Sequence, residues 1–223
     1  IIDTMEQIFT REYHLPNYQT AVIICGKGSG KSYMAGLINT YLCYLIMSFK
    51  DITKYLNEKY NTDLAPKTTI TLLGMAPDAI KAKLIVYNST KRFIFDNKFL
   101  VDKNWVPDPE VVNELRFLQE DTETHQIYQK ISVMPGNSSQ TVMIGYNLFG
   151  GVIDEACFFV EKNYDPVAEI YKEFNYRRFS RFKNNGLVTL ISSAKSSDCE
   201  AEKLFELAST DSSILAIRKP VYD

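Results

Sequence analysis

A glycine-rich segment near the amino terminus has the residue types that bind phosphate. Residues 25–32 read Cys-Gly-Lys-Gly-Ser-Gly-Lys-Ser, and they lie between a short apolar run and a long helical pattern. That is the context of a P-loop, in which glycines let successive backbone N–H groups point at phosphate oxygens. Lys31 would reach the β- and γ-phosphates, and the Ser32 hydroxyl would coordinate Mg²⁺. The predicted ATP-binding residues are Gly26, Lys27, Gly28, Ser29, Gly30, Lys31 and Ser32.

Two adjacent carboxylates follow a second apolar segment. Residues 149–155 read Phe-Gly-Gly-Val-Ile-Asp-Glu, which resembles a Walker B segment. Asp154 at a strand end could hold Mg²⁺ through water, and Glu155 could orient and polarise the attacking water. A solvated acidic pair at a strand end is the simpler alternative. Together with the P-loop, the pair predicts an ATPase that carries its own catalytic base.

Small hydroxyl residues end a third apolar segment. Ser192 and Ser193 follow the run 187–191 and precede Ala194. At the tip of a strand beside the P-loop, these hydroxyls could sense the γ-phosphate or hold Glu155. Two serines that cap a turn before a helix would give the same pattern.

The elements needed to position these residues follow from the hydrophobic pattern. Strands alternate with helices, which predicts an α/β fold of the P-loop type with a mainly parallel sheet and helices on both faces. In such sheets the active site lies at the carboxyl ends of the strands. Strands are expected at 20–25, 68–75, 187–191 and, in two or three pieces, within 131–153; helices are expected at 30–47, 52–60, 77–89, 108–118, 165–182 and 198–208.

Composition limits the remaining possibilities. The net charge of −2 means that any nucleic-acid surface is a local patch. The four cysteines lack the spacing of a zinc site or a disulfide framework, which favours a reducing cytoplasm. No apolar stretch is long enough to cross a bilayer, so no membrane partner is expected. The chain begins with Ile, which suggests a fragment of a longer protein. We expect a helix and loop over residues 1–19 and one P-loop domain over 20–223.

The three segments together resemble the ATPase domain of the large terminase subunit, the DNA-packaging motor of tailed bacteriophages. The resemblance rests on Lys27 within the P-loop, on Asp154–Glu155, and on Ser192-Ser193-Ala194 as the coupling motif. It implies a homo-oligomeric ring that acts on double-stranded DNA in the host cytoplasm, with a portal protein and a small terminase subunit as partners. It also places Tyr18 and Gln19 where the family recognises adenine.

Two departures from the family pattern concern what the chain lacks. No set of acidic residues for the family's carboxy-terminal nuclease follows the coupling motif, so we expect that nuclease domain to be absent. No arginine lies within 137–153, where such motors often have a residue that acts on the neighbour's ATP. Arg178 and Arg181 are the preferred substitutes for this arginine finger, with Arg116 and Arg177 as further candidates.

Alternatives to a packaging motor stay open. A helicase-like ATPase would need further helicase motifs after Ser193, and none is found. A nucleotide-binding scaffold would have no need of Glu155. The basic and aromatic run 171–183 could track DNA phosphates, form a subunit interface, or be a helix with its aromatic side chains facing inward.

Overall fold

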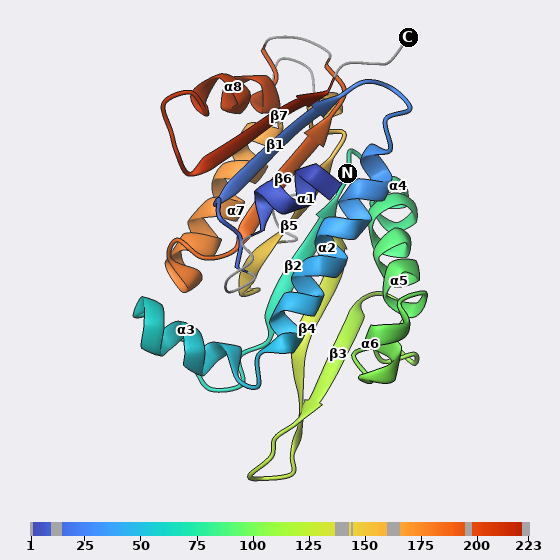
Figure 1. Ribbon diagram of the computed structural model, residues 1–223, viewed down its shortest axis with the longest axis vertical. Coiled ribbons are helices and arrows are strands. Elements are labelled where there is room, and N and C mark those ends of the chain that lie inside the picture. The colour runs from blue at the N-terminus through green and yellow to red at the C-terminus, as the bar shows by residue number, and fades with distance from the viewer. Residues whose placement is uncertain are drawn as a thin grey trace.

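A seven-stranded sheet forms the centre of the molecule. The computed structural model describes residues 2–9, 15–136, 143, 145–159, 166–194 and 198–219. The strand order is β3-β4-β2-β5-β6-β1-β7 (Figure 1), and every neighbouring pair is parallel except β3 and β4. This arrangement confirms the predicted α/β fold with a mainly parallel sheet. The strands are β1 Thr20–Cys25, β2 Ile70–Met75, β3 Leu115–Glu120, β4 Ile127–Gly136, β5 Leu148–Asp154, β6 Leu187–Ser192 and β7 Ile214–Lys219.

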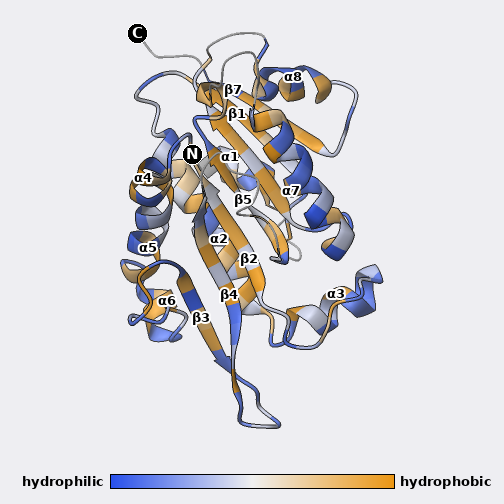
Figure 2. Ribbon diagram, turned by 180° about the vertical axis from the view of Figure 1, so that it is seen from behind, coloured by the Kyte–Doolittle hydropathy of each residue, from blue (hydrophilic) through white to orange (hydrophobic). Residues whose placement is uncertain are grey.

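Helices cover both faces of this sheet. Helices α1 and α2 lie across one face with α4 and α5 beside them (Figure 1), and α7 and α8 cover the other face (Figure 2). No helix in the described part of the chain is long and apolar enough to span a membrane. The helices are α1 Ile2–Ile8, α2 Lys31–Ser48, α3 Ile52–Tyr60, α4 Ala79–Lys81, the π-helix η1 Ala82–Tyr87, α5 Asn88–Phe95, α6 Lys98–Asp102, the 3-10 turn η3 Ala156–Phe158, α7 Pro166–Phe182 and α8 Glu200–Leu207.

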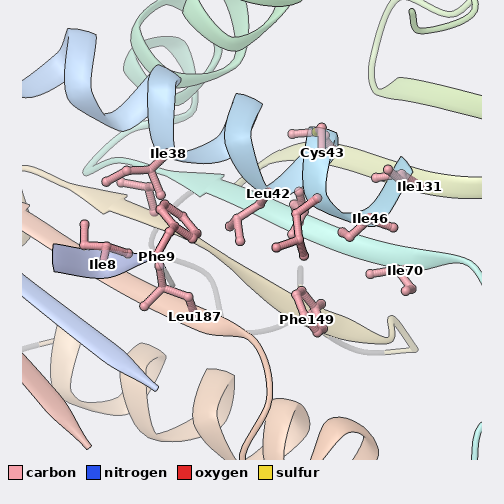
Figure 3. Close-up of a cluster of buried hydrophobic side chains, with 14 of the residues drawn as sticks. Ile8, Phe9, Ile38, Leu42, Cys43, Ile46, Ile70, Ile131, Phe149 and Leu187 are labelled. Atoms are coloured by element: carbon pink, nitrogen blue, oxygen red, sulfur yellow. The ribbon is translucent and has the colours of Figure 1, made fainter. Parts of the chain in front are cut away.

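The core between α2 and the sheet explains why α2 keeps its position. Ile38, Leu42 and Ile46 recur every four residues, so they share one side of the helix and face the strands (Figure 3). Phe149 of β5 and Leu187 of β6 lie opposite them, and all five side chains are fully buried. Burying a side chain of this size contributes roughly 1.5–3 kcal/mol. The residue that begins α2 is therefore fixed relative to the ends of β1 and β5.

One predicted helix is wrong. Residues 115–120 form strand β3, which pairs antiparallel with β4, where a helix over 108–118 was expected. The Asp108 carboxylate accepts the amide of Glu110 in a local turn and does not begin a helix. Leu115 and Phe117 are both buried and lie two residues apart, which is the period typical of a strand. Val112, within the expected helix, is largely exposed.

Two further differences concern element boundaries. Asp78 caps the helix that follows β2, because its carboxylate accepts the Lys81 amide, so the helix begins after Pro77, where its first turn was expected. That helix continues through the π-helical turn to Phe95, beyond the expected end at Ser89. Strand β7 was not predicted at all, and it extends the sheet beyond β1. Residues 137–142 of the expected strand region lie outside the described residues.

Candidate functional site

The predicted motifs meet at one edge of the sheet. Strands β1, β5 and β6 are parallel neighbours or next neighbours, so their carboxyl ends lie together. The P-loop follows β1, Asp154 ends β5, and Ser192 ends β6. We call the end of the sheet where these strands stop the P-loop edge. The end where these strands start is called the opposite edge. The register pairs Asp154 with Ile191, and Ile24 with Ser192, so all three segments end at nearly the same level.

The backbone of the P-loop explains two of its glycines. Gly28 and Gly30 both have φ of 81°, a left-handed conformation that other residues rarely adopt. Gly30 also caps the start of α2, whose first amides carry partial positive charge. Cys25 is the last residue of β1 and is buried, so the position where the motif usually has its first glycine lies in an ordinary strand. A loop of this form can surround an anion with backbone N–H groups.

Lys31 and Ser32 link the P-loop to the second motif. Lys31 is buried, and its Nζ donates a hydrogen bond of 3.0 Å to the Gly26 carbonyl across the loop. The Ser32 hydroxyl donates to Asp154 Oδ2 at 3.4 Å, although 122 residues separate the two. Hydroxyl and carboxylate oxygens are the ligands that Mg²⁺ prefers. A cation beside the P-loop therefore fits these two oxygens, which point at each other from different elements.

Asp154 and Glu155 have different environments although they are neighbours. Asp154 is completely buried, and burial together with the charge of Glu155 raises its pKa to about 6. The Glu155 amide, the Ser32 hydroxyl and the charge of Lys31 each oppose that rise in the Asp154 pKa. Glu155 is partly exposed and has a φ of 54°, which is unusual for a residue with a side chain. Its amide donates to Asp154 Oδ1 at 3.0 Å, so the turn that exposes Glu155 also holds the aspartate.

The two serines at the end of β6 differ in their contacts. Ser192 is fully buried, and its Oγ accepts the amide of Cys157 at 3.0 Å. The strand end thereby holds the turn that follows Glu155, through Cys157 and not through Glu155 itself. Ser193 is partly exposed and lines a cavity beside the P-loop.

That cavity reveals residues that sequence reasoning missed. It has a volume of about 310 Å³ and lies between the P-loop and the ends of β1, β6 and β7. Arg218 and Lys219 reach it because β7 pairs with β1, and the Lys219 carbonyl accepts the Gly26 amide at 3.3 Å. Arg218 is paired with Glu202 of α8 and lies over the Phe205 ring. If residues 214–219 had been recognised as a strand of the sheet, Arg218 and Lys219 could have been predicted at this edge.

Gln19, the predicted adenine contact, lies at the opposite edge. It immediately precedes β1, whose six residues separate it from the P-loop by about 20 Å. Its side-chain oxygen accepts a hydrogen bond of 2.9 Å from Arg178 Nη2. Gln19 therefore lies at the other end of β1 from the P-loop, and its role in binding adenine stays a prediction.

Arg178, a predicted arginine finger, is buried at the same opposite edge. It donates to the carbonyls of Lys183 and Asn185 and to the side chains of Gln19 and Asn175. Only 3% of the residue is exposed, so the guanidinium holds its own chain together and is not presented to a neighbour. This burial has a simple cause: position 178 lies on the inner side of α7, facing the sheet.

The other arginine candidates are nearer to solvent. Arg181 is exposed near the end of α7, where a neighbouring molecule could reach it. Arg177 pairs with Glu173 at 2.6 Å, and Arg116 pairs with Glu114 at 2.7 Å. Arg181 and Arg177 lie in the last turns of α7, which ends at the opposite edge, where β6 begins. None of these arginines lies at the P-loop edge of its own chain.

Comparison with solved structures supports the fold. The ATPase domain of the Thermus phage P74-26 large terminase is similar, with a TM-score of 0.56 and 13% identity over 92% of this chain and 77% of that one. The large terminase of the thermophilic bacteriophage D6E has a TM-score of 0.56 and 11% identity, over 91% of this chain and 40% of that one. The HK97 bacteriophage large terminase has a TM-score of 0.52 and 14% identity, over 90% and 35%. At these identities the likeness establishes a terminase-like P-loop fold.

Sequence comparison identifies a family. A search of curated proteins gives no match. The family model described as "Uncharacterized protein MJ0330, N-terminal P-loop domain" matches residues 1–223. The P-loop of that description corresponds to the loop between β1 and α2, where Lys31 and Ser32 lie. This chain therefore belongs to the family of the MJ0330 N-terminal P-loop domain.

Proposed function

We propose that this domain hydrolyses ATP as the motor of a terminase-like DNA-packaging machine. The observation that carries the proposal is the contact between Ser32 and Asp154, 3.4 Å apart, beside Glu155. A loop that only binds phosphate needs neither the buried aspartate nor a second carboxylate next to it. The terminase-like fold supports the choice of this class among P-loop proteins.

Each residue at the P-loop edge has a proposed role. Backbone amides of the loop and Lys31 bind and neutralise the phosphates of ATP. Ser32 and Asp154 hold Mg²⁺, which when bound neutralises charge on the phosphate oxygens. Glu155 accepts a hydrogen bond from the attacking water and orients it in line with the γ-phosphate. Ser193, which lines the cavity beside the loop, transmits the state of the γ-phosphate to the rest of the domain.

The use of this hydrolysis is proposed from the resemblance to packaging motors. Copies of the chain would assemble as a ring around double-stranded DNA in the cytoplasm of an infected host. A portal protein and a small terminase subunit would complete the machine. Arg181 is the remaining candidate among the preferred fingers for acting on a neighbour's ATP, since its side chain is exposed.

ATP turnover per protomer, measured at increasing protein concentration with and without double-stranded DNA, tests this function. A motor is expected to turn over faster per protomer as copies assemble, and several-fold faster again with DNA. Ser193→Val should retain ATP binding and lose the stimulation by DNA. If wild-type protein binds ATP but does not hydrolyse it under any of these conditions, the domain is a nucleotide-binding scaffold.

A further inference from the structure

Two cysteines that lie far apart in the sequence meet in space. Cys157 and Cys199 are 42 residues apart, and the structure joins them in a disulfide with a Cα–Cα distance of 5.3 Å. This separation is within the range that a disulfide spans without movement of the backbone. The cysteine spacing did not point to a disulfide, and the structure has this one. Sequence spacing does not show that β5 and β6 bring these residues together.

The disulfide lies beside the proposed catalytic base. Cys157 is the second residue after Glu155 and belongs to the short turn η3. Its amide already donates to Ser192 Oγ at the end of β6. Cys199 caps the start of α8, and α8 carries the Glu202 that holds Arg218 beside the P-loop. The bond thus joins the turn that positions Glu155 to the helix behind the P-loop edge.

We propose that Cys157 and Cys199 form a redox-sensitive link that fixes the Glu155 turn when it is oxidised. Formation of the link breaks two S–H bonds and makes one S–S bond, with a small disulfide such as oxidised glutathione as oxidant. The reaction passes through a mixed disulfide, and the oxidant accepts two electrons and leaves as two thiols. The effect on ATP turnover rests on the proposed function, whereas the link itself does not.

The other two cysteines are unpaired in the structure. Cys25 and Cys43 are free and buried, at 2% and 1% exposure. Burial raises the pKa of the Cys43 thiol far above its ordinary value, which disfavours the reactive thiolate. Oxidation is therefore expected to consume two of the four thiols and to leave two free.

Reduction would remove one of two anchors from the turn. Glu155 has a left-handed backbone, which persists only where its surroundings impose it. In the oxidised state Cys157 is held by its sulfur and by its amide; in the reduced state only the hydrogen bond to Ser192 remains. We expect faster amide exchange across 155–159 and a kcat several-fold lower. The KM for ATP should stay the same, because neither anchor contacts the P-loop.

Hydrogen exchange of residues 155–159 tests the link in the full chain, after treatment with oxidised glutathione or with a phosphine reductant. Cys199→Ser should exchange like the reduced protein in both conditions, and serine is a favourable residue at the N-cap position of α8. Cys43→Ala should respond to oxidation as the wild type does. Two free thiols after oxidation, with slower exchange across 155–159, are the expected result. Four free thiols, or equal exchange in the two states, would overturn the link.

ATP turnover in the same samples distinguishes failure of the redox link from failure of the proposed ATPase function. A kcat that falls on reduction in wild type and Cys43→Ala, but not in Cys199→Ser, is the expected result. An unchanged kcat alongside a change in exchange would refute the effect on catalysis and leave a structural disulfide. If exchange responds to oxidation while neither state hydrolyses ATP, the proposed function fails and the redox link stands.

Discussion

The two edges of the sheet use buried cations in different ways. At the P-loop edge, Lys31 makes one hydrogen bond, to a carbonyl of the loop, among the residues that the structure describes. At the opposite edge, Arg178 donates to four acceptors. Lys130, also at the opposite edge, is 3% exposed and donates to the Phe49 carbonyl at the end of α2. Among the described residues Lys31 and Lys130 each use one donor, but Lys31 does so beside a loop whose form suits phosphate, whereas Arg178 uses four donors within its own chain.

The largest expected effect is on Lys31. We expect Lys31→Ala to reduce ATP turnover by roughly 100-fold or more, because one preorganised cation at a phosphate contributes that much. The free energy of unfolding should change little, since only one loop hydrogen bond is lost. Parallel turnover assays and urea denaturation would measure both quantities. A large loss of stability with intact turnover would place Lys31 among the structural cations and break the comparison.

Arg178 should show the reverse. Arg178→Met leaves two carbonyls, of which the Asn185 carbonyl is buried, and two side-chain oxygens without their donor, so we expect the free energy of unfolding to fall by about 2–4 kcal/mol. Nucleotide affinity of the folded variant should be unchanged. Urea denaturation and nucleotide titration measure the two quantities. Unchanged stability together with a loss of turnover on mixing with wild type would restore Arg178 as a finger.

The charge on Lys130 predicts a pH dependence. Burial lowers the pKa of Lys130 to about 8, whereas the unfolded chain keeps a pKa of about 10.4. Between these values the folded protein binds fewer protons than the unfolded chain, so the free energy of unfolding should rise with pH. We expect a gain of order 1–2 kcal/mol between pH 8 and pH 9.5, measured by urea denaturation. Lys130→Met should lack this rise, and an equal rise in both proteins would assign it to other groups.

The smallest effect on stability is expected for Arg181. Its side chain is exposed on the same helix as Arg178, so Arg181→Met should change the free energy of unfolding by less than about 0.5 kcal/mol. The variant is the matched control for Arg178→Met, and it also tests the finger. Turnover that rises with protein concentration in wild type and stays flat in Arg181→Met would support a role in trans. The same concentration dependence in both would remove Arg181 from the candidates.

The sequence predicted the parts of the fold whose local pattern and tertiary environment agree. Strands β1, β2 and β6 are continuous apolar runs because they are buried on both faces, and such runs are distinctive. Strand β3 is the outermost strand of the sheet, which leaves Leu118 exposed and weakens the alternation of apolar and polar side chains. It was therefore mistaken for a helix. Strand β7 is the outermost strand at the other side of the sheet, and it therefore also mixes buried and partly exposed residues.

The site was predictable where a residue's place in the chain fixes its place in space. Lys31, Ser32 and Asp154 follow strand ends, and parallel strands bring such ends together. Gln19 precedes its strand, which sends it to the opposite edge, and the direction of β1 alone could have shown this. The burial of Arg178 and the pairing of Cys157 with Cys199 depend on packing between α7, α8 and the sheet, which sequence spacing does not encode.

Steady-state ATP hydrolysis by wild type and Glu155→Gln, with ATP affinity measured on the same samples, tests whether Glu155 is the catalytic base. Glutamine keeps the size of the side chain but cannot accept the proton of the attacking water. We expect turnover to fall by roughly 100-fold or more, the scale of general-base catalysis, while affinity stays within a few-fold. Equal turnover in the two proteins would contradict this role of Glu155, because the P-loop edge would then hold no catalytic carboxylate at position 155.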